Sequence, residues 1–337
     1  MAAVSVGGLV AGAGTALGAF PGANGKIAFG SDRPVAGQPP NDNIWTMRAD
    51  GRKLVNLTPD SPTSDDNPNW RADGQQIVFE SDRRTPGNPI PKGFEGPDFE
   101  IFSMNADGSD VRQITFNELD DEDPAWSPDG RHIVFVRDFD PVRGQVNYDI
   151  FTMRASGGDE RNITNHPDPL DQVPNWSPDG ERIAFTSNRG GGDGVEAAEI
   201  YTMRVDGSRV QQLTDNDTFD GAPNWSPSGR KLSFQSHREG QLSIYTMRRD
   251  GGRQERLTFD VPGAFGSAWA PNGCRVAFSS FANPEIFTIN VDGTGPRNLT
   301  NNPAFDFAPD WQPLDDHHGD DDDEVARDQV DRSICRD

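Results

Sequence analysis

The stretch that decides the fold is Pro124-Ala125-Trp126-Ser127-Pro128-Asp129-Gly130, which is followed by Ile133-Val134-Phe135, Ile150-Phe151-Thr152-Met153 and Arg161-Asn162-Ile163-Thr164. The same repeat of four segments recurs along the chain. A period of roughly 40 to 55 residues is typical of propellers, solenoids and other repeat arrays. Copies of this repeat begin near Trp70, Trp126, Trp176, Trp225, Trp269 and Trp311.

Each repeat contains four segments that we interpret as β-strands. Ser-Pro-Asp-Gly after the Trp segment predicts a tight turn, because Pro fixes φ at the second turn position and Gly suits the last. Asp-Gly after the third segment, as at Asp206-Gly207, predicts a hairpin. The second segments, such as Ile183-Ala184-Phe185, show no polar alternation. A strand that is covered on both faces has this pattern, so each sheet is expected to be packed between two others.

The two ends of the repeat region complete each other. The last Trp segment, at Trp311, has no second segment after it, whereas the repeats begin with Asn24-Gly25-Lys26-Ile27-Ala28-Phe29 and no Trp segment before it. Pairing of these two strands would close a ring and leave no exposed sheet edge. The sequence therefore predicts an all-β fold, a single six-bladed β-propeller of four-stranded antiparallel blades over residues 20–314.

The repeats resemble those of a known family. Trp-Ser-Pro-Asp-Gly, Ile-Ala-Phe, Ile-Tyr-Thr-Met and Asp-Gly followed by Leu-Thr are similar to the repeats of TolB-type propellers, the PD40 class of WD40-like repeats. The resemblance covers about Gly25 to Pro313, and the Gly-His and Trp-Asp signatures of true WD40 repeats are missing. TolB proteins add an N-terminal α/β domain, for which no room is expected before Gly25. The resemblance therefore does not bring the role of TolB in the Tol–Pal envelope system with it.

Charge and composition argue against one class of partner. The 337 residues carry a net charge of −23 and contain no cluster of Lys and Arg. Binding to a phosphate backbone needs such clusters, so no nucleic acid partner is expected. Residues 315–337 hold ten acidic residues and three Arg, which predicts an acidic disordered tail. The remaining acidity favours solubility and would attract cations or basic partners.

The first segment, residues 1–19, differs from the rest of the chain. Ala2 to Phe20 contains no charged residue and is rich in Ala, Gly, Val and Leu. This composition predicts an export signal with cleavage after Ala19, although the usual basic start is missing. A retained membrane anchor is the alternative. We expect a monomer that is secreted or periplasmic and has no stable membrane insertion after cleavage. In an oxidising compartment Cys274 and Cys335 could pair.

One acidic position recurs five residues before the Trp. A carboxylate stands there in five repeats and Ala264 in the sixth. If the Trp strand is innermost, these carboxylates surround one mouth of the central channel, where like charges could recruit a cation or a basic peptide. The structural alternative is that each Asp accepts backbone N–H groups in the loop before the Trp strand. The candidate binding residues are Asp65, Asp121, Asp171, Asp220 and Asp306. No cofactor is expected, with a divalent cation at this mouth as the alternative.

Two further features lie after the second strands. Ser-x-Arg recurs there, and we expect its Arg to pair with carboxylates between blades, with a ligand contact as the alternative. The Arg residues are Arg33, Arg83, Arg189 and Arg238. Long segments of variable sequence follow in the first four repeats and would all emerge on one side of the disc, where binding residues often concentrate. They cover residues 34–43, 84–98, 138–148 and 190–198.

Two common motifs of enzymes are absent from the sequence. No Gly-x-Ser-x-Gly elbow occurs, and Gly190-Gly191-Gly192 precedes no Lys-Ser or Lys-Thr. The predicted function is therefore an exported scaffold without catalysis that binds a protein or peptide on the loop side or at the channel mouth. One alternative is a carbohydrate- or metal-binding propeller with lyase- or hydrolase-type activity. Another is a purely structural module of a larger envelope assembly.

Overall fold

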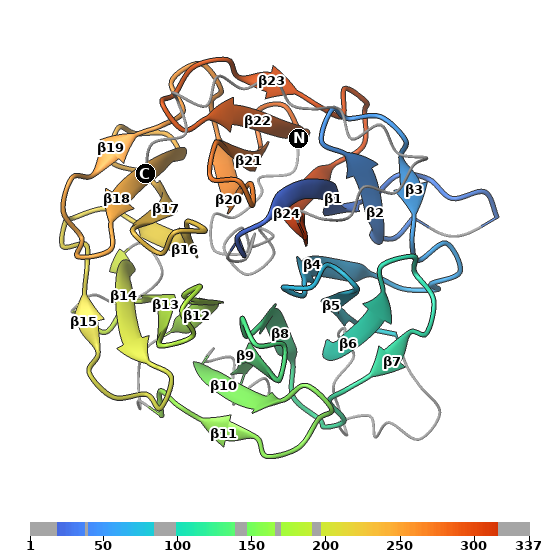
Figure 1. Cartoon of the computed structure of the whole chain (residues 1–337), viewed down its shortest axis with the longest axis horizontal. Coiled ribbons are helices and arrows are strands. Elements are labelled where there is room, and N and C mark those ends of the chain that lie inside the picture. The colour runs from blue at the N-terminus through green and yellow to red at the C-terminus, as the bar shows by residue number, and fades with distance from the viewer. Residues whose placement is uncertain are drawn as a thin grey trace, which may run out of the picture.

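The computed structural model describes residues 19–37, 40–83, 99–138, 147–165, 170–190 and 197–315. Six four-stranded antiparallel sheets stand around a central axis as the blades of a propeller (Figure 1). We name them blades A to F in chain order, with blade A built from both ends of the repeat region. The predicted fold, a six-bladed propeller, is confirmed.

The four strands of each blade follow the four segments of the repeat. The innermost strands of blades A to F are β24 (Asp306–Leu314), β4 (Asp65–Trp70), β8 (Asp121–Trp126), β12 (Asp171–Trp176), β16 (Asp220–Trp225) and β20 (Ala264–Trp269). The second strands are β1 (Ala23–Ser31), β5 (Gln76–Ser81), β9 (His132–Asp138), β13 (Arg182–Ser187), β17 (Lys231–Ser236) and β21 (Arg275–Ser280).

The outermost strand of each blade is only two residues long and is more exposed than the third strand. The third strands are β2 (Asn43–Arg48), β6 (Glu100–Asn105), β10 (Tyr148–Arg154), β14 (Glu199–Arg204), β18 (Ser243–Arg248) and β22 (Ile286–Asn290). The outermost strands are β3 (Val55–Asn56), β7 (Arg112–Gln113), β11 (Arg161–Asn162), β15 (Gln211–Gln212), β19 (Glu255–Arg256) and β23 (Arg297–Asn298).

Blade A closes the ring. Strand β24 pairs antiparallel with β1, with Ile27 opposite Trp311 and Ala23 opposite Leu314. The innermost strand of this blade thus comes from the end of the repeat region and its second strand from the beginning. The predicted pairing of the Trp311 segment with the Ile27 segment is confirmed.

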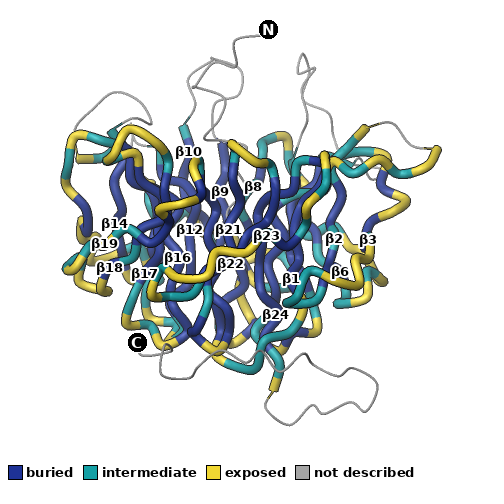
Figure 2. The backbone as a smooth tube through the Cα atoms, turned by 90° about the horizontal axis from the view of Figure 1, so that it is seen from above, coloured by how far each residue is buried: buried dark blue, intermediate teal, exposed yellow. Residues whose placement is uncertain are grey.

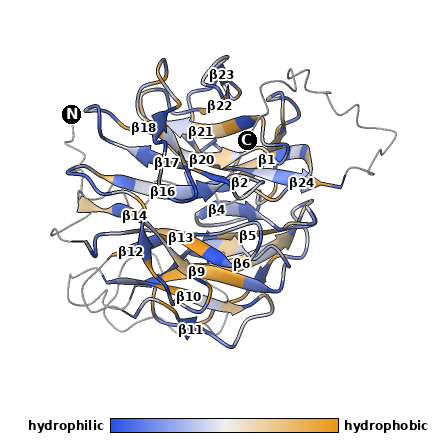
Figure 3. Ribbon diagram, turned by 60° about the vertical axis from the view of Figure 1, so that its left-hand side comes forward, coloured by the Kyte–Doolittle hydropathy of each residue, from blue (hydrophilic) through white to orange (hydrophobic). Residues whose placement is uncertain are grey.

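The hydrophobic core is divided among the six interfaces between neighbouring blades. In one such cluster Ala28 and Ile44 of blade A contact Trp70, Phe79 and Met104 of blade B. The buried strands occupy the interior, whereas the exposed residues lie in the outer turns (Figure 2). The second strand β9 is largely hydrophobic, whereas most of the connecting turns are hydrophilic (Figure 3). Both faces of every blade are therefore covered, as the apolar second segments predict.

Polar side chains also join neighbouring blades near the axis. The backbone N–H of Trp70 in blade B donates to the Asp310 carboxylate of blade A at 2.7 Å. The N–H of Trp126 in blade C donates to the side-chain oxygen of Asn69 in blade B at 2.8 Å. Asp310 precedes Trp311 of blade A and Asn69 precedes Trp70 of blade B, so in both cases the residue before the Trp of one blade holds the Trp of the next blade in register. Burial raises the pKa of Asp310 well above its usual value.

A β-bulge interrupts each innermost strand at the same place. The residue three before the Trp has a positive φ, including 50° at Asn67, 52° at Asp123 and 55° at Val173. The pairing with the second strand shifts there, for example between Asp66 and Asn69. A left-handed backbone at a β-branched residue such as Val173 costs energy, so the surrounding packing must hold it in place. The repeat motifs alone do not reveal this bulge.

The chain ends lie largely outside the described residues. Residues 1–18 and 316–337 hold most of the predicted export signal and acidic tail, and Cys335 belongs to the second range. Ala19 and Phe20 are described and buried. Ala19 lies among residues of blades E and F, and Phe20 among residues of blades B and C. In the described part of the chain, no helix is long and apolar enough to cross a membrane.

Candidate functional site

The strand directions give the ring two different faces. At one face the innermost strands begin, the second strands end and the third strands begin, so we call it the loop face. The Ser-Pro-Asp-Gly and Asp-Gly turns lie at the opposite face, which we call the turn face. The second strands end and the third strands begin at the loop face, but residues 38–39, 84–98, 139–146 and 191–196 of the variable segments between them lie outside the described residues.

The candidate Asp residues begin five of the innermost strands, and each is fully buried. Every one forms an ion pair with an Arg of its own blade. The pairs are Asp306 with Arg33, Asp65 with Arg83, Asp121 with Arg137, Asp171 with Arg189 and Asp220 with Arg238. The predicted pairing of these Arg residues between blades is therefore wrong. The structure puts the Asp residues on one face, one to a blade, and brings each to an Arg rather than to another Asp of the set.

Side chains supply the other hydrogen bonds to these carboxylates. The Asp306 carboxylate accepts from the Ser31 hydroxyl at 2.5 Å and from Asn302 Nδ2 at 2.8 Å. Asp121 accepts from Asn117 Nδ2 at 2.7 Å. The structural alternative expected backbone donors, whereas these donors are side chains. Burial raises the pKa of Asp121 and of Asp171, and the paired Arg opposes that shift in both.

Aromatic rings cover each paired Arg. The guanidinium of Arg83 lies 5.5 Å from the ring centroid of Phe79 and 5.3 Å from that of Phe102. Arg137 lies over Phe135 and Phe151 in the same way, at 5.3 and 4.9 Å. Such contacts favour a cation over the ring face and shelter the ion pair from water. Arg137 stands on strand β9 itself, opposite Asp121, and so does not belong to a Ser-x-Arg motif.

Blade F lacks both members of the pair. Ala264 replaces the Asp, and Ala282 stands where the Ser-x-Arg motif would place the Arg. The rings of Phe265 and Phe281 stack there, with centroids 3.8 Å apart and planes 12° apart. Phe305 lies beside both rings, at 6.3 Å from Phe265 and 6.2 Å from Phe281. We call Leu242, Phe265, Phe281, Phe305 and Phe307, which pack as one apolar cluster at the loop face, the Phe patch.

A second acidic group lies at the loop face of blades A to C. Glu80 accepts hydrogen bonds from Asn67 Nδ2 at 2.9 Å and from the backbone N–H of Asp123 at 2.7 Å. Burial, together with the charge of Asp123, raises the pKa of Glu80 to about 8. We call this group the carboxyl cluster, and its members are Asp42, Asp66, Glu80, Asp82, Glu122 and Asp123.

The carboxyl cluster crowds several largely buried acidic groups together, and this crowding raises their pKa values. Burial, together with the charges of Asp32 and Asp82, raises the pKa of Asp42 to about 6. Burial and neighbouring carboxylates also raise the pKa values of Asp66 and Glu122 well above their usual range. Within the described residues, Oδ1 of Asp66 is buried and has no hydrogen-bond partner. The sequence pattern does not single out these residues, because the repeat does not conserve them from blade to blade.

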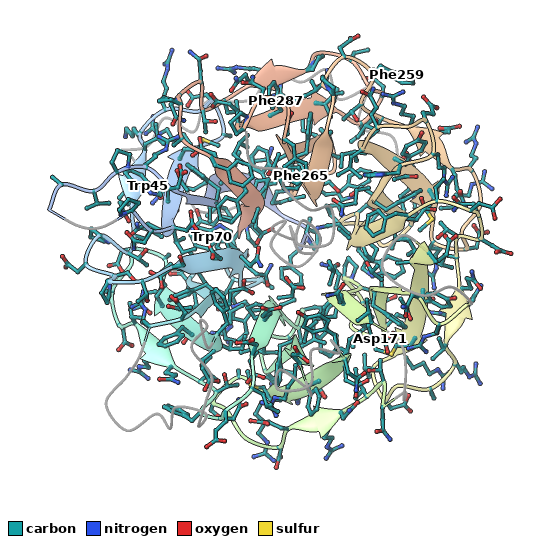
Figure 4. All side chains as sticks on the ribbon, turned by 180° about the vertical axis from the view of Figure 1, so that it is seen from behind. Trp45, Trp70, Asp171, Phe259, Phe265 and Phe287 are labelled. Atoms are coloured by element: carbon teal, nitrogen blue, oxygen red, sulfur yellow. The ribbon has the colours of Figure 1, made fainter. Side chains whose placement is uncertain are left out.

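The residue after the recurrent Asp shows how uneven the ring is. Blades B and C have Asp66 and Glu122 there, blade D has Gln172 and blade E has Gly221, whereas blades F and A have Phe265 and Phe307. The loop face is therefore acidic along blades B and C and aromatic along blades F and A. Figure 4 shows Phe265 beside the central opening, Phe259 at the rim and Asp171 in blade D.

Two other features bear on ligand chemistry. In the described ranges, no group of three or more His, Cys, Asp or Glu side chains is arranged to hold a metal ion. A groove of about 750 Å³ lies at the turn face between blades C and D, where Pro128, Asp129, Arg154 and Asp179 contribute to its lining. Its charges are mixed and exposed, and it lies on the face opposite the carboxyl cluster and the Phe patch.

Comparisons with known proteins agree with the fold. The model of the TolB β-propeller domain, PD40, matches residues 2–140 and 192–267. The Tol-Pal system protein TolB of Rhizorhabdus wittichii is 38% identical over 76 residues, which is 23% of this chain and 16% of that protein. The matched segment thus spans about one sixth of the curated relative.

Solved structures show the same architecture at low sequence identity. TolB from Acinetobacter baumannii superposes with a TM-score of 0.67 and 21% identity, over 86% of this chain and 67% of that chain. An oligogalacturonate lyase from Vibrio parahaemolyticus superposes with a TM-score of 0.53 and 14% identity, over 86% of this chain and 78% of that chain. These two likenesses concern the fold alone. The family model covers more than half of the sequence, and so this chain belongs to the TolB β-propeller (PD40) family.

Proposed function

We propose that this protein is an exported, non-catalytic propeller scaffold that binds a protein or peptide at the loop face, around the channel mouth. The observation that carries the proposal is the uneven loop face, with the carboxyl cluster on blades A to C and the Phe patch on blades F and A. A repeat that served only to build the ring has no need of this asymmetry. Crowded, largely buried carboxyl groups and half-buried aromatic rings are groups that a partner can contact favourably.

Family membership supports a binding role. The curated relative is named as a component of the Tol-Pal system, and the matching family model is that of the TolB β-propeller domain. The names of such relatives favour an envelope location, so we propose that the protein acts in the periplasm or as a secreted monomer. Fractionation of cells that express the full chain tests this, with Edman sequencing of the mature protein. Recovery of the protein only from the cytoplasm, with residues 1–19 retained, would contradict export.

The recurrent Asp residues take a structural role in this proposal. Because an Arg neutralises each of Asp65, Asp121, Asp171, Asp220 and Asp306, the partner is expected to contact the carboxyl cluster instead. A divalent cation at the channel mouth stays a prediction. Titration with calcium or manganese, followed by calorimetry and by the melting temperature, tests it. Heat of binding that is lost in an Asp66→Asn variant would support a cation there.

Affinity capture from the native envelope and secreted fractions tests the binding role itself. The full chain is compared with a loop-face variant, Asp66→Asn with Glu122→Gln, and with a turn-face control, Asp107→Asn. We expect a specific protein to be retained by the wild type and the control but lost or reduced with the loop-face variant. Capture that is unaffected by loop-face changes, or turnover of an acidic polysaccharide by the purified protein, would refute the proposed function.

A further inference from the structure

We propose that the loop face binds a cationic peptide segment that bears an aromatic or aliphatic side chain, with this side chain on the Phe patch and a neighbouring Lys or Arg at the carboxyl cluster. The inference rests on the proposed function and names the class of ligand. Three observations carry it: the geometry of the Phe patch, its position beside the carboxyl cluster and the crowding of largely buried carboxyl groups in that cluster.

The Phe patch offers stacked rings that remain partly accessible. Phe265 and Phe307 are buried at 0% and 5% exposure and form its floor. Phe281 and Phe305 are half-buried, so parts of these two rings reach the surface. Their planes are 15° apart, and the ring of Phe305 lies 5.2 Å from that of Phe307. A flat or branched apolar side chain can extend this stack and remove the remaining ring area from water.

The Phe patch lies beside the acidic residues, because Phe307 of β24 and Asp66 of β4 hold the same position in the innermost strands of the neighbouring blades A and B. The backbone N–H of Phe305 donates to the Asp32 carboxylate at 2.7 Å, and the N–H of Asp32 donates to the Phe305 carbonyl at 3.3 Å. The charge of Asp32 in turn acts on Asp42, and Asp42 acts on Asp66. A short peptide can therefore contact the Phe patch and reach the cluster without leaving the loop face.

Charge complementarity determines the sign of the charge that the ligand must carry. The nearby cations Arg33, Arg83 and Arg137 are already paired with Asp306, Asp65 and Asp121. An added ammonium or guanidinium would relieve the repulsion among the remaining carboxyl groups and could donate to the half-buried carboxyl of Asp66, whose buried Oδ1 has no hydrogen-bond partner within the described residues. Acidic peptides and nucleic acid would instead be repelled by a chain that carries a net charge of −23.

A free metal ion fits this surface less well than a cationic side chain does. In the part of the chain that the structure describes, no three carboxylates converge with the geometry of a metal site. The flexible stem of Lys or Arg can reach a half-buried carboxylate while it packs against apolar atoms. The Phe patch next to the cluster supplies those apolar contacts, and a metal ion would leave the patch unused.

Binding of such a ligand must be coupled to proton release. The carboxyl of Glu80 faces Asn67 of β4, Glu122 and Asp123 of β8 and Asp120 before β8. The groups around Asp66 are Asp65, Asp42, Glu80 and Asp82, and Glu122 also faces Asp138 of β9 and Tyr148 of β10. Because this assembly holds protons at neutral pH, a bound cation displaces them. Affinity therefore rises with pH, as long as the ligand itself stays protonated.

The experiment uses calorimetry on the full chain with three capped tripeptides. Acetyl-Phe-Lys-Lys-amide is the probe, acetyl-Gly-Lys-Lys-amide lacks the apolar side chain, and acetyl-Phe-Glu-Glu-amide reverses the charge. We expect the Gly peptide to bind about tenfold more weakly than the Phe peptide. No binding is expected for the Glu peptide. Affinity for the probe should increase about tenfold between pH 5.5 and pH 8.5, with heats that depend on the ionisation enthalpy of the buffer.

Variants locate the site and exclude a general charge effect. Asp66→Asn and Glu122→Gln keep the side-chain shape. Each should weaken binding of the probe about fivefold to tenfold and reduce the pH dependence of this binding. Phe281→Ser should weaken the Phe peptide but not the Gly peptide. Asp217→Asn and Phe259→Ser alter exposed groups of the same face outside the patch and cluster, and they should leave binding unchanged. Melting curves verify that each variant is folded.

The results separate this inference from the proposed function. Three outcomes would each overturn the inference. The first is an equal loss of binding in the Asp217→Asn control, and the second is a probe that binds no better than the Glu peptide. The third is an affinity that falls as the pH rises. If affinity capture nevertheless retains a protein through other loop-face residues, the scaffold function stands and only the ligand class is wrong. If a neutral oligosaccharide binds the Phe patch and the peptides do not, the inference is likewise overturned.

Discussion

Blade F and the other five blades stabilise the same edge of the propeller in two different ways. Blades A to E place a buried Asp–Arg pair under two aromatic rings, whereas blade F has Ala264 and Ala282 at those positions and stacks Phe265 on Phe281. Both members of the pair are absent together. Removal of one member alone would leave a buried charge without its partner, which is strongly destabilising. The comparison teaches that the pair acts as one unit, and that apolar packing can replace it.

The same comparison explains where binding chemistry can arise. In blades A to E the Arg and its rings occupy the edge, so these side chains serve the blade itself. In blade F the edge is apolar, and its rings extend to Phe305 at the boundary with blade A. One departure from the repeat thus creates a surface that five regular blades do not have.

The largest effect is expected from Phe265→Ala in blade F. Phe265 is fully buried at the centre of the Phe patch, so its truncation should cost about 3 to 5 kcal/mol of unfolding free energy. Urea denaturation measures the change. Phe259→Ala is the control, because Phe259 is 63% exposed, and its truncation should cost less than about 0.5 kcal/mol. Equal effects of the two changes would show that the stack does not stabilise blade F.

A smaller but still large effect is expected from Arg189→Ala in blade D. The Asp171 side chain is fully buried, so loss of its Arg should cost about 3 kcal/mol at neutral pH. Burial already raises the pKa of Asp171, and without Arg189 the carboxyl should take up a proton more readily. The penalty should therefore fade as the pH falls toward 4. Arg154→Ala, at an ion pair with 64% and 52% exposure, should cost less than about 1 kcal/mol.

The double variant Asp171→Ala, Arg189→Ala gives blade D the two Ala residues that blade F has at these positions. It should be more stable than Arg189→Ala alone, with a residual cost of about 1 kcal/mol, because no buried charge remains. A double-mutant cycle at pH 7 measures the coupling between the two side chains. If the double variant were as unstable as the sum of the single variants, the pair would not act as one unit.

The smallest effect, of opposite sign, is expected from Glu122→Gln in the carboxyl cluster. Burial and neighbouring carboxylates raise the pKa of Glu122 in the folded state, so its contribution to stability is lost as the pH rises through that value. The melting temperature of the Gln variant should thus be about 2 °C higher than that of the wild type at pH 8.5 and equal to it at pH 4. Asp217→Asn should show no such difference between the two pH values. A lower melting temperature for Glu122→Gln at pH 8.5 would show that the carboxylate is stabilised by contacts.

The sequence predicted the fold further than it predicted the candidate site. Strand order, blade number and the closure of Trp311 on Ile27 follow from local motifs that recur at a fixed period, so each repeat corroborates the others. The Asp residues were found from the same recurrence, but their Arg partners were assigned to the wrong blade. Asp306 and Arg33 are 273 residues apart, and only closure of the ring makes them members of one blade.

The amino-acid sequence by itself determined a ring of six similar sheets, because strand period, turn residues and buried Trp positions are local properties. Tertiary structure decided which side chains meet at the loop face. Phe281 and Phe305 come from the blade F and blade A segments, and Asp66 and Glu122 from separate repeats, so no local pattern links them. Their juxtaposition, and the raised pKa values of the buried carboxyls, depend on burial and long-range packing, which exist only in the closed propeller.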